Sequence, residues 1–108
     1  MKLKCGGELI SNNVKFCDGF SKFKGLMFSK KLKINEGLIL DNSSDIHMLF
    51  VFQSIDVVWL KDKKVVDIKE NIKPFSLLIR PKIKADTVIE LPLGKAKLFK
   101  LGDSIDFR

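Results

Sequence analysis

Three ionisable residues, His47, Asp56 and Glu90, stand within segments that are otherwise largely apolar. A charged group in an apolar strand is costly unless it is paired, hydrogen-bonded or part of a site. A histidine and a carboxylate that lie within about 3 Å of each other or of a substrate can act as an acid–base pair. Each residue could instead be structural, with His47 bonded to a backbone carbonyl and Asp56 accepting backbone N–H bonds from the Gln53–Ser54 turn.

Two further side chains, Trp59 and Met27, would complete a ligand pocket around these groups. Ligand pockets combine apolar and aromatic walls with a few placed polar groups. We therefore predict one shared cleft, lined by Met27, His47, Asp56, Trp59 and Glu90, that holds a small polar ligand or a peptide. The sequence has no nucleophile elbow, glycine-rich phosphate loop or metal motif, so it names no reaction class and implies no cofactor.

The two cysteines, Cys5 and Cys17, do not have the spacing of a zinc site with His47, so we expect no metal. Cys17 and His47 could meet in space as a nucleophile pair, but nothing local marks Cys17 as activated. We interpret it as a small buried or half-buried thiol.

The net charge of +7 comes from 18 lysines and two arginines against 13 acidic residues. Lysine is a mobile point charge, whereas readout of bases and phosphates favours the arginine fork. The lysines are also spread along the chain from Lys2 to Lys100, which indicates a solvated surface rather than a binding stripe. The charge therefore argues against nucleic-acid binding, although a weak binder of nucleic acid or of an acidic partner stays open as an alternative.

A chain of 108 residues, 45% of them apolar, fits one globular domain over residues 1–108. The longest apolar runs, MLFVF and VIELPL, are far shorter than the roughly 20 residues of a membrane-spanning helix. The start MKLKCGGELI lacks the apolar core of a signal peptide. We expect a cytoplasmic protein without membrane association, either a monomer or a weak homodimer.

Short apolar segments separated by turn residues predict a mainly β fold. Residues 1–17 predict one or two edge strands, and residues 56–60 and 65–68 predict an antiparallel hairpin across the connection KDKK. Residues 18–28 are the best helix candidate, because Phe20, Phe23 and Met27 recur at helical spacing. The remaining predicted elements are strands at 38–40, 46–52, 77–79, 87–91 and 105–107 and one helical turn between Gly94 and Gly102.

The segment from Ile46 to Leu60 would supply two central strands, since both faces of residues 46–52 are largely apolar. Side chains alternate between the faces of a strand. Alternation places Asp56 on one face with Val58 and Leu60, and it places His47 at the margin of the first strand. Both polar residues would then lie at the edges of a central β pair, near Glu90.

Six motifs, in chain order, resemble one known family: GLMFSKKL (25–32), SSDIH (43–47), SIDVVWL (54–60), KVVDIKENIKPF (64–75), VIELPLG (88–94) and LGDSI (101–105). The family is Domain of Unknown Function 192, and the chain is similar to its archaeal members over residues 20–107. The resemblance implies a compact, mainly antiparallel β barrel or sandwich with one or two short helices and no assigned activity.

The resemblance also adds a candidate residue. Lys22 or Lys24 stands where the family tends to have arginine, so Lys22 joins the candidate ligand-binding residues. A lysine would hold an anion less firmly than a bidentate arginine. Val51 and Ser54 depart from the pattern as well, whereas the positions that match it are His47, Asp56, Pro74, Glu90, Gly94, Gly102 and Asp103.

Two main functions from different classes follow from these residues. The first is a β-barrel or sandwich binding module for a small polar ligand or a peptide. The alternative is an enzyme that uses His47 with Asp56 or Glu90 as an acid–base pair. The lack of any catalytic motif favours the binding module.

Overall fold

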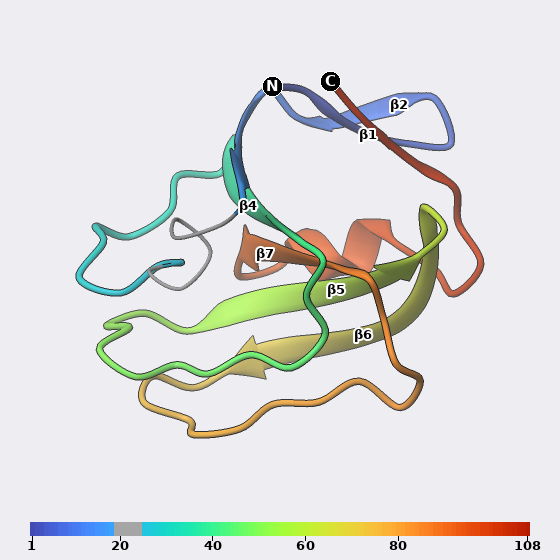
Figure 1. Ribbon diagram of the computed structural model, residues 1–108. Helices are drawn as coiled ribbons and strands as arrows, with labels where there is room; N and C mark the ends of the chain where they lie inside the picture. The colour runs from blue at the N-terminus through green and yellow to red at the C-terminus, as the bar shows by residue number, and fades with distance from the viewer. Residues whose placement is uncertain (19–24) are drawn as a thin grey trace.

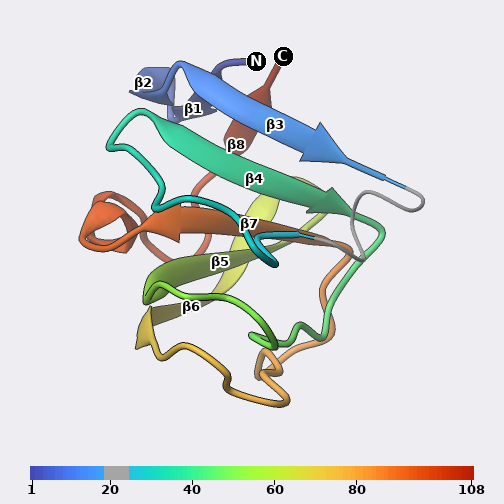
Figure 2. The same ribbon diagram turned by 90° about the vertical axis from the view of Figure 1, so that its left-hand side faces the viewer.

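The computed structural model describes residues 1–18 and 25–108. Its strands form a mixed five-stranded sheet in the order β3-β4-β7-β5-β6 and a small antiparallel sheet in the order β2-β1-β8 (Figures 1 and 2). A short 3₁₀ helix, η1, follows β7. The bounds are β1 Leu3–Cys5, β2 Glu8–Ser11, β3 Asn13–Cys17, β4 Glu36–Asp41, β5 Ile55–Lys61, β6 Lys64–Ile72, β7 Thr87–Pro92, η1 Lys95–Leu98 and β8 Ile105–Phe107.

The strands β5 and β7 form the centre of the large sheet, and nearly all of their residues are buried. Both are continuous apolar runs rich in valine, isoleucine and leucine, which is typical of strands covered on both faces. Each lies between two partners, because β7 pairs with β4 and β5, and β5 pairs with β7 and β6. A polar residue in either strand therefore lies deep in the molecule.

The large sheet separates two apolar cores. The sheet-side core lies between the two sheets and under η1; it includes Leu3, Val58, Leu60, Ala96 and Ile105. The loop-side core lies on the other face, under the long connections around residues 25–33, 42–54 and 73–86 (Figure 1). It includes Leu38, Met48, Val51, Val57 and Trp59.

Most of the predicted β structure is confirmed. The hairpin is β5 and β6, the segments 38–40, 87–91 and 105–107 lie in β4, β7 and β8, and the predicted turn after Gly94 is η1. The first 17 residues form three strands instead of one or two. In the described part of the chain, no helix is long and apolar enough to cross a membrane.

Two predicted strands and the predicted helix are wrong in their described parts. Residues 46–52 and 77–79 form a single bridge, Ile46 with Ile79, and otherwise run as loops. Phe50 adopts a positive φ of 56°, which interrupts the alternation that a strand requires. The helix candidate falls partly on residues outside the described ones, and its described end at 25–28 is a turn.

The pairing of β3 with β4 is parallel, whereas the other pairs of described strands are antiparallel, so the expected mainly antiparallel fold is confirmed. Parallel neighbours need a long crossover connection, and residues 18–35 provide it. The crossover brings Leu26, Met27 and Leu32 onto the loop-side core. The described part of this connection, residues 25–35, therefore covers part of one face of the sheet.

Gly37 marks a close approach between β4 and β7. A Cβ atom added there would lie 3.1 Å from the backbone oxygen of Glu90 and 3.1 Å from a methyl carbon of Leu91. A backbone oxygen in a central strand cannot easily move, so Gly37→Ala should overpack the sheet and lower the free energy of unfolding by about 2 kcal/mol. Urea unfolding would measure this change; an unchanged midpoint would show that the sheet yields at this position.

Candidate functional site

Asp56 is a buried carboxylate whose bonds are all to the backbone. It is 1% exposed, and its Oδ1 accepts the N–H of Asn71 at 3.0 Å. Its Oδ2 accepts the N–H groups of Gly94 at 2.9 Å and Ala96 at 3.0 Å. Three donors satisfy a carboxylate inside an apolar layer. Asp56 therefore ties the end of β6 to the turn before η1, with donors other than the predicted Gln53–Ser54 turn.

Glu90 is the opposite case, a buried carboxyl with an orphaned oxygen. It is 3% exposed, and among the described residues its Oε1 has no hydrogen-bond partner. Burial raises the pKa of Glu90 from 4.5 to about 7. Desolvation disfavours the charged form, so near neutral pH this carboxyl exchanges readily between its acid and carboxylate forms.

Asp56 and Glu90 lie on opposite faces of the large sheet. The residue opposite Glu90 on β5 is Val57, which belongs to the loop-side core, and directly paired residues share a face. Asp56 alternates with Val57 and shares the sheet-side face with Val58. The shared cleft predicted for His47, Asp56 and Glu90 is therefore wrong, because the sheet separates two of its members.

The other candidate residues lie on the loop side. His47 is exposed, and its Nδ1 accepts the N–H of Leu49 at 3.2 Å instead of donating to a carbonyl. Trp59 is fully buried and donates from Nε1 to the carbonyl of Ser44 at 2.6 Å. Met27 packs partly buried against the loop-side core, whereas Lys22 lies outside the described residues. A ligand-binding role for each residue stays a prediction.

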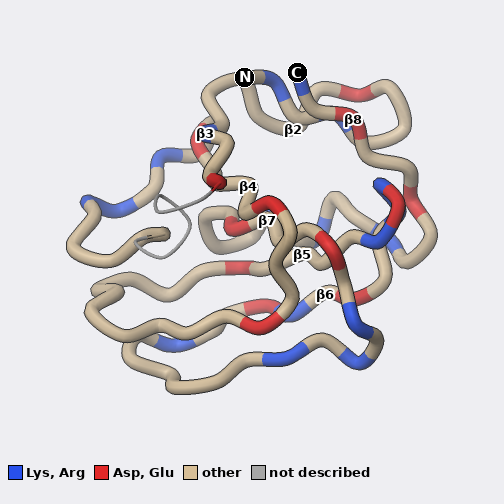
Figure 3. The backbone as a smooth tube through the Cα atoms, in the orientation of Figure 1, with Lys and Arg blue, Asp and Glu red and all other residues tan. Residues whose placement is uncertain are grey.

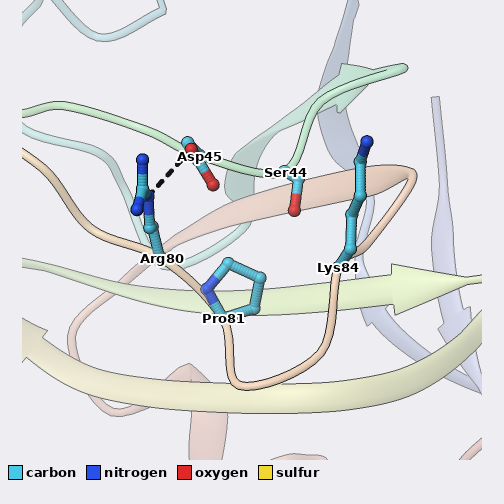
Figure 4. A pocket seen from close by; sticks show the side chains of 5 residues that line it. All are labelled: Ser44, Asp45, Arg80, Pro81 and Lys84. Carbon is cyan, nitrogen blue, oxygen red and sulfur yellow. Dashed lines mark hydrogen bonds and ion pairs between the residues drawn. The ribbon is translucent and has the colours of Figure 1, made fainter.

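A shallow surface pocket lies beside the Trp59 contact. It is lined by Ser44, Asp45, Arg80, Pro81 and Lys84, and Figure 4 shows Arg80 and Asp45 meeting across its mouth. Their ion pair, at 3.1 Å, has side chains 66% and 47% exposed. Exposed pairs of this kind contribute little to stability. None of the predicted site residues that the structure describes lines this pocket.

The half-buried Cys5 is bonded to a carboxylate. Cys5 donates from Sγ to Asp103 at 3.3 Å. Burial, and then this bond to a carboxylate, raises the pKa of the Cys5 thiol to about 11, so little of the reactive thiolate forms at neutral pH. Among the residues that the structure describes, no cluster of histidine, cysteine or acidic side chains could hold a metal ion.

The most prominent surface feature is a group of four exposed phenylalanines, Phe28, Phe50, Phe52 and Phe75, which we name the phenylalanine patch. They are 66%, 45%, 60% and 46% exposed, respectively. Phe28 stacks on Phe50 with ring centroids 5.0 Å apart, and Phe52 meets Phe75 edge-on at 5.3 Å. Figure 2 looks onto the loops that carry them. Contiguous exposed apolar surface of this kind marks interaction sites.

The backbone under the patch is strained. Phe28, Phe50 and Phe75 have φ angles of 57°, 56° and 63°, in the left-handed region that bulky residues rarely adopt. Two backbone bonds hold them there: Phe28 N–H donates to the Phe50 carbonyl at 2.8 Å, and Phe75 N–H donates to the Met48 carbonyl at 2.9 Å. Strain of this type costs about 1–3 kcal/mol per residue and gathers at functional sites.

Sequence reasoning missed the phenylalanine patch because it assigned Phe50 and Phe52 to a buried strand. A usable signal was present in the charges. The three segments that carry the patch, 26–33, 46–54 and 71–79, contain no aspartate or glutamate, although the chain has 13 acidic residues. The Lys and Asp/Glu side chains inside these segments are all lysines, although Asp45 and Glu70 border two of the segments, whereas a solvated surface mixes both signs.

Comparison with known proteins places this geometry in a family. The model of Domain of Unknown Function 192, described as Uncharacterized ACR, matches residues 3–107. A UPF0127 protein of Thermococcus sibiricus is 35% identical to this chain, and the match covers 96% of this chain and 71% of the relative. A UPF0127 protein of Pyrococcus furiosus is 34% identical, and the match covers 94% of this chain and 91% of the relative. A crystal structure from Novosphingobium aromaticivorans, of a protein of unknown function, is similar in fold with a TM-score of 0.82 at 20% identity, covering 98% of this chain and 84% of that one.

These matches span nearly the whole chain, and they agree with the resemblance carried by its six motifs. The family description and the three proteins named above give no specific activity. The β domain that displays the phenylalanine patch therefore belongs to the uncharacterised family Domain of Unknown Function 192.

Proposed function

We propose that the protein is a binding module that captures a polypeptide partner on the phenylalanine patch. Of the two ligands expected from the sequence, the patch favours the peptide. Its rings are 45–66% exposed, so they offer a broad surface and not the enclosure that a small polar ligand needs. The cytoplasm remains the predicted location of this module.

The observation that carries the proposal is the combination of exposure and strain at Phe28, Phe50 and Phe75. Neither property helps the isolated fold, since exposed rings bury little surface and positive φ angles are unfavourable. Both help binding, because aromatic side chains held in a fixed arrangement form hot spots without ordering on contact. The exposure and the fixed arrangement of these rings therefore fit a binding surface.

The test is a double substitution, Phe28→Asn/Phe50→Asn. Asparagine tolerates positive φ, so relief of strain should offset the lost ring stacking, leaving the free energy of unfolding within about 1 kcal/mol of wild type. Binding should fall sharply. A random peptide library displayed on phage, panned against immobilised wild type, should yield peptides with aromatic or aliphatic anchors whose affinity falls by at least about tenfold for the variant.

Leu98→Asn/Leu101→Asn is the matched control, since these leucines are 53% and 69% exposed and lie outside the patch. The control should bind the selected peptides like wild type. Equal binding by all three proteins, or no enriched peptide at all, would overturn the proposal. Unchanged unfolding midpoints would show that the loss of binding is not a loss of fold.

A further inference from the structure

A lysine-lined groove adjoins the phenylalanine patch. It has a volume of about 510 Å³ and lies between residues 29–33 and the edge strand β3 with its neighbour β4. Leu26, Leu32 and Leu38 contribute apolar lining. Its cationic residues are Lys15, Lys30, Lys31 and Lys33. We call this feature the lysine groove.

Among the described residues that line the lysine groove there is one acid, Glu36, which is already engaged. Its Oε1 accepts the backbone N–H of Lys33 at 2.7 Å. The four lysine side chains therefore outnumber the acid, and they leave the groove strongly positive. Lysine ammonium groups are compact charges on flexible stems, so they can follow carboxylates of varied geometry.

The groove and the patch share one rigidly held segment. Phe28 belongs to the patch, whereas its neighbours Ser29 to Lys33 line the groove. Gln53 fixes this segment: it donates from Nε2 to the Lys30 carbonyl at 3.0 Å and accepts the Leu32 N–H on Oε1 at 2.8 Å. A single extended ligand can therefore contact both features without any rearrangement of the loop.

The surface around the phenylalanine patch is positively charged, like the lysine groove. Lys73 lies on the loop that carries Phe75, and the three patch segments have no carboxylate. In Figure 3 the tips of these loops, at the left of the molecule, are blue or tan without red. We propose that the partner captured by the module is an acidic polypeptide segment whose apolar side chains cover the patch and whose carboxylates enter the lysine groove. This inference rests on the proposed function for its use of the patch.

Two other occupants fit the same surface less well. A second copy of this chain would set Lys30, Lys31, Lys33 and Lys73 against the same lysines, and like charges across an interface are repulsive. An anionic lipid surface matches the charge, but fluid lipid adapts to any apolar shape. It would gain nothing from rings fixed by strained backbone at Phe28, Phe50 and Phe75.

The experiment uses two synthetic peptides that share their aromatic and leucine anchors, one carrying glutamates and the other carrying lysines at the same positions. Fluorescence anisotropy should show that the glutamate peptide binds wild type at least about tenfold more tightly than the lysine peptide and weakens with added salt. Lys31→Glu/Lys33→Glu should lower its affinity at least about tenfold. Lys82→Glu/Lys84→Glu, with the same charge change outside the groove, should lower it by less than about threefold.

The outcomes separate the inference from the proposed function. Equal affinity for the two peptides, with loss in Phe28→Asn/Phe50→Asn, would overturn the acidic partner while leaving the binding module intact. If the two charge-reversal variants lose affinity for the glutamate peptide equally, the carboxylates do not bind in the lysine groove. If wild type co-sediments with phosphatidylglycerol vesicles and binds neither peptide, the inference is overturned in favour of lipid. If wild type self-associates in a way that depends on Phe28 and Phe50, it is overturned in favour of a second copy.

Discussion

Replacement of Asp56 by alanine is expected to lower the free energy of unfolding by about 4 kcal/mol. The substitution removes the acceptor of three backbone N–H groups, on Asn71, Gly94 and Ala96, in a place where the carboxylate is 1% exposed. Hydrogen bonds to a charged group are worth about 1.5–3 kcal/mol each, and bonds that share one acceptor group do not add fully. Urea unfolding followed by circular dichroism would measure the loss.

Asp56→Asn retains one acceptor oxygen, so it should lose about half as much stability. Asp106→Ala is the matched control, because Asp106 forms a 3.6 Å ion pair with Arg108 at the surface and should matter by less than about 0.5 kcal/mol. Amide exchange should accelerate at Gly94 and Ala96 in the Asp56 variants. A fully stable Asp56→Ala protein would contradict the structural role and restore Asp56 as a candidate for ligand binding.

Glu90→Gln is expected to stabilise the protein at pH 8 by about 3 kcal/mol and to leave it nearly unchanged at pH 4. The folded state raises the pKa of Glu90 from 4.5 to about 7, so between these values it holds a proton that the unfolded chain has released. Because the folded state binds more protons, wild-type stability should fall as pH rises from 4.5 to about 7 and level off above. The glutamine variant has no such proton.

Unfolding free energies measured across this pH range, for wild type and Glu90→Gln, would test the prediction as a difference curve. Glu70→Gln serves as the control, since Glu70 is exposed on β6 and its replacement should leave the pH dependence of wild type in place. Parallel curves for wild type and Glu90→Gln would mean that the carboxyl is hydrated or paired in solution.

The central strands could be predicted from the sequence because the apolar runs and turn residues that specify them lie within the strands or next to them. The runs IDVVWL and TVIELP are buried on both faces, and the turn residues after Lys61 fix the hairpin. Alternation also gave the correct face for Asp56. The face of Glu90 relative to Asp56 depends on register: Val57 pairs with Glu90, and a shift of one residue would have put both carboxyls on one side. Register is set by packing between distant segments.

The phenylalanine patch was missed for a different reason, although the charges carried a signal. Residues 46–52, with six apolar side chains, have the composition of a buried strand. Their path is decided by Phe50, whose positive φ is held by contacts to Phe28 and Phe75 from other loops. Local preference opposes this conformation, so sequence reasoning chooses the strand. Such conflicts between local preference and the final fold are expected where a surface serves binding.

The pairing of β1 with β8 sets the order in which the domain can assemble during synthesis. Leu3 pairs with Phe107, and the backbone groups of Lys2 and Arg108 bond to each other at 2.7 and 3.0 Å, so these contacts form only after synthesis has advanced by more than a hundred positions. Contacts between such distant positions slow folding, because a long loop must close first. Until β8 has been synthesised, β1 pairs with β2 alone, and the sheet-side core lacks Ile105, so apolar side chains such as Leu3 stay exposed for longer.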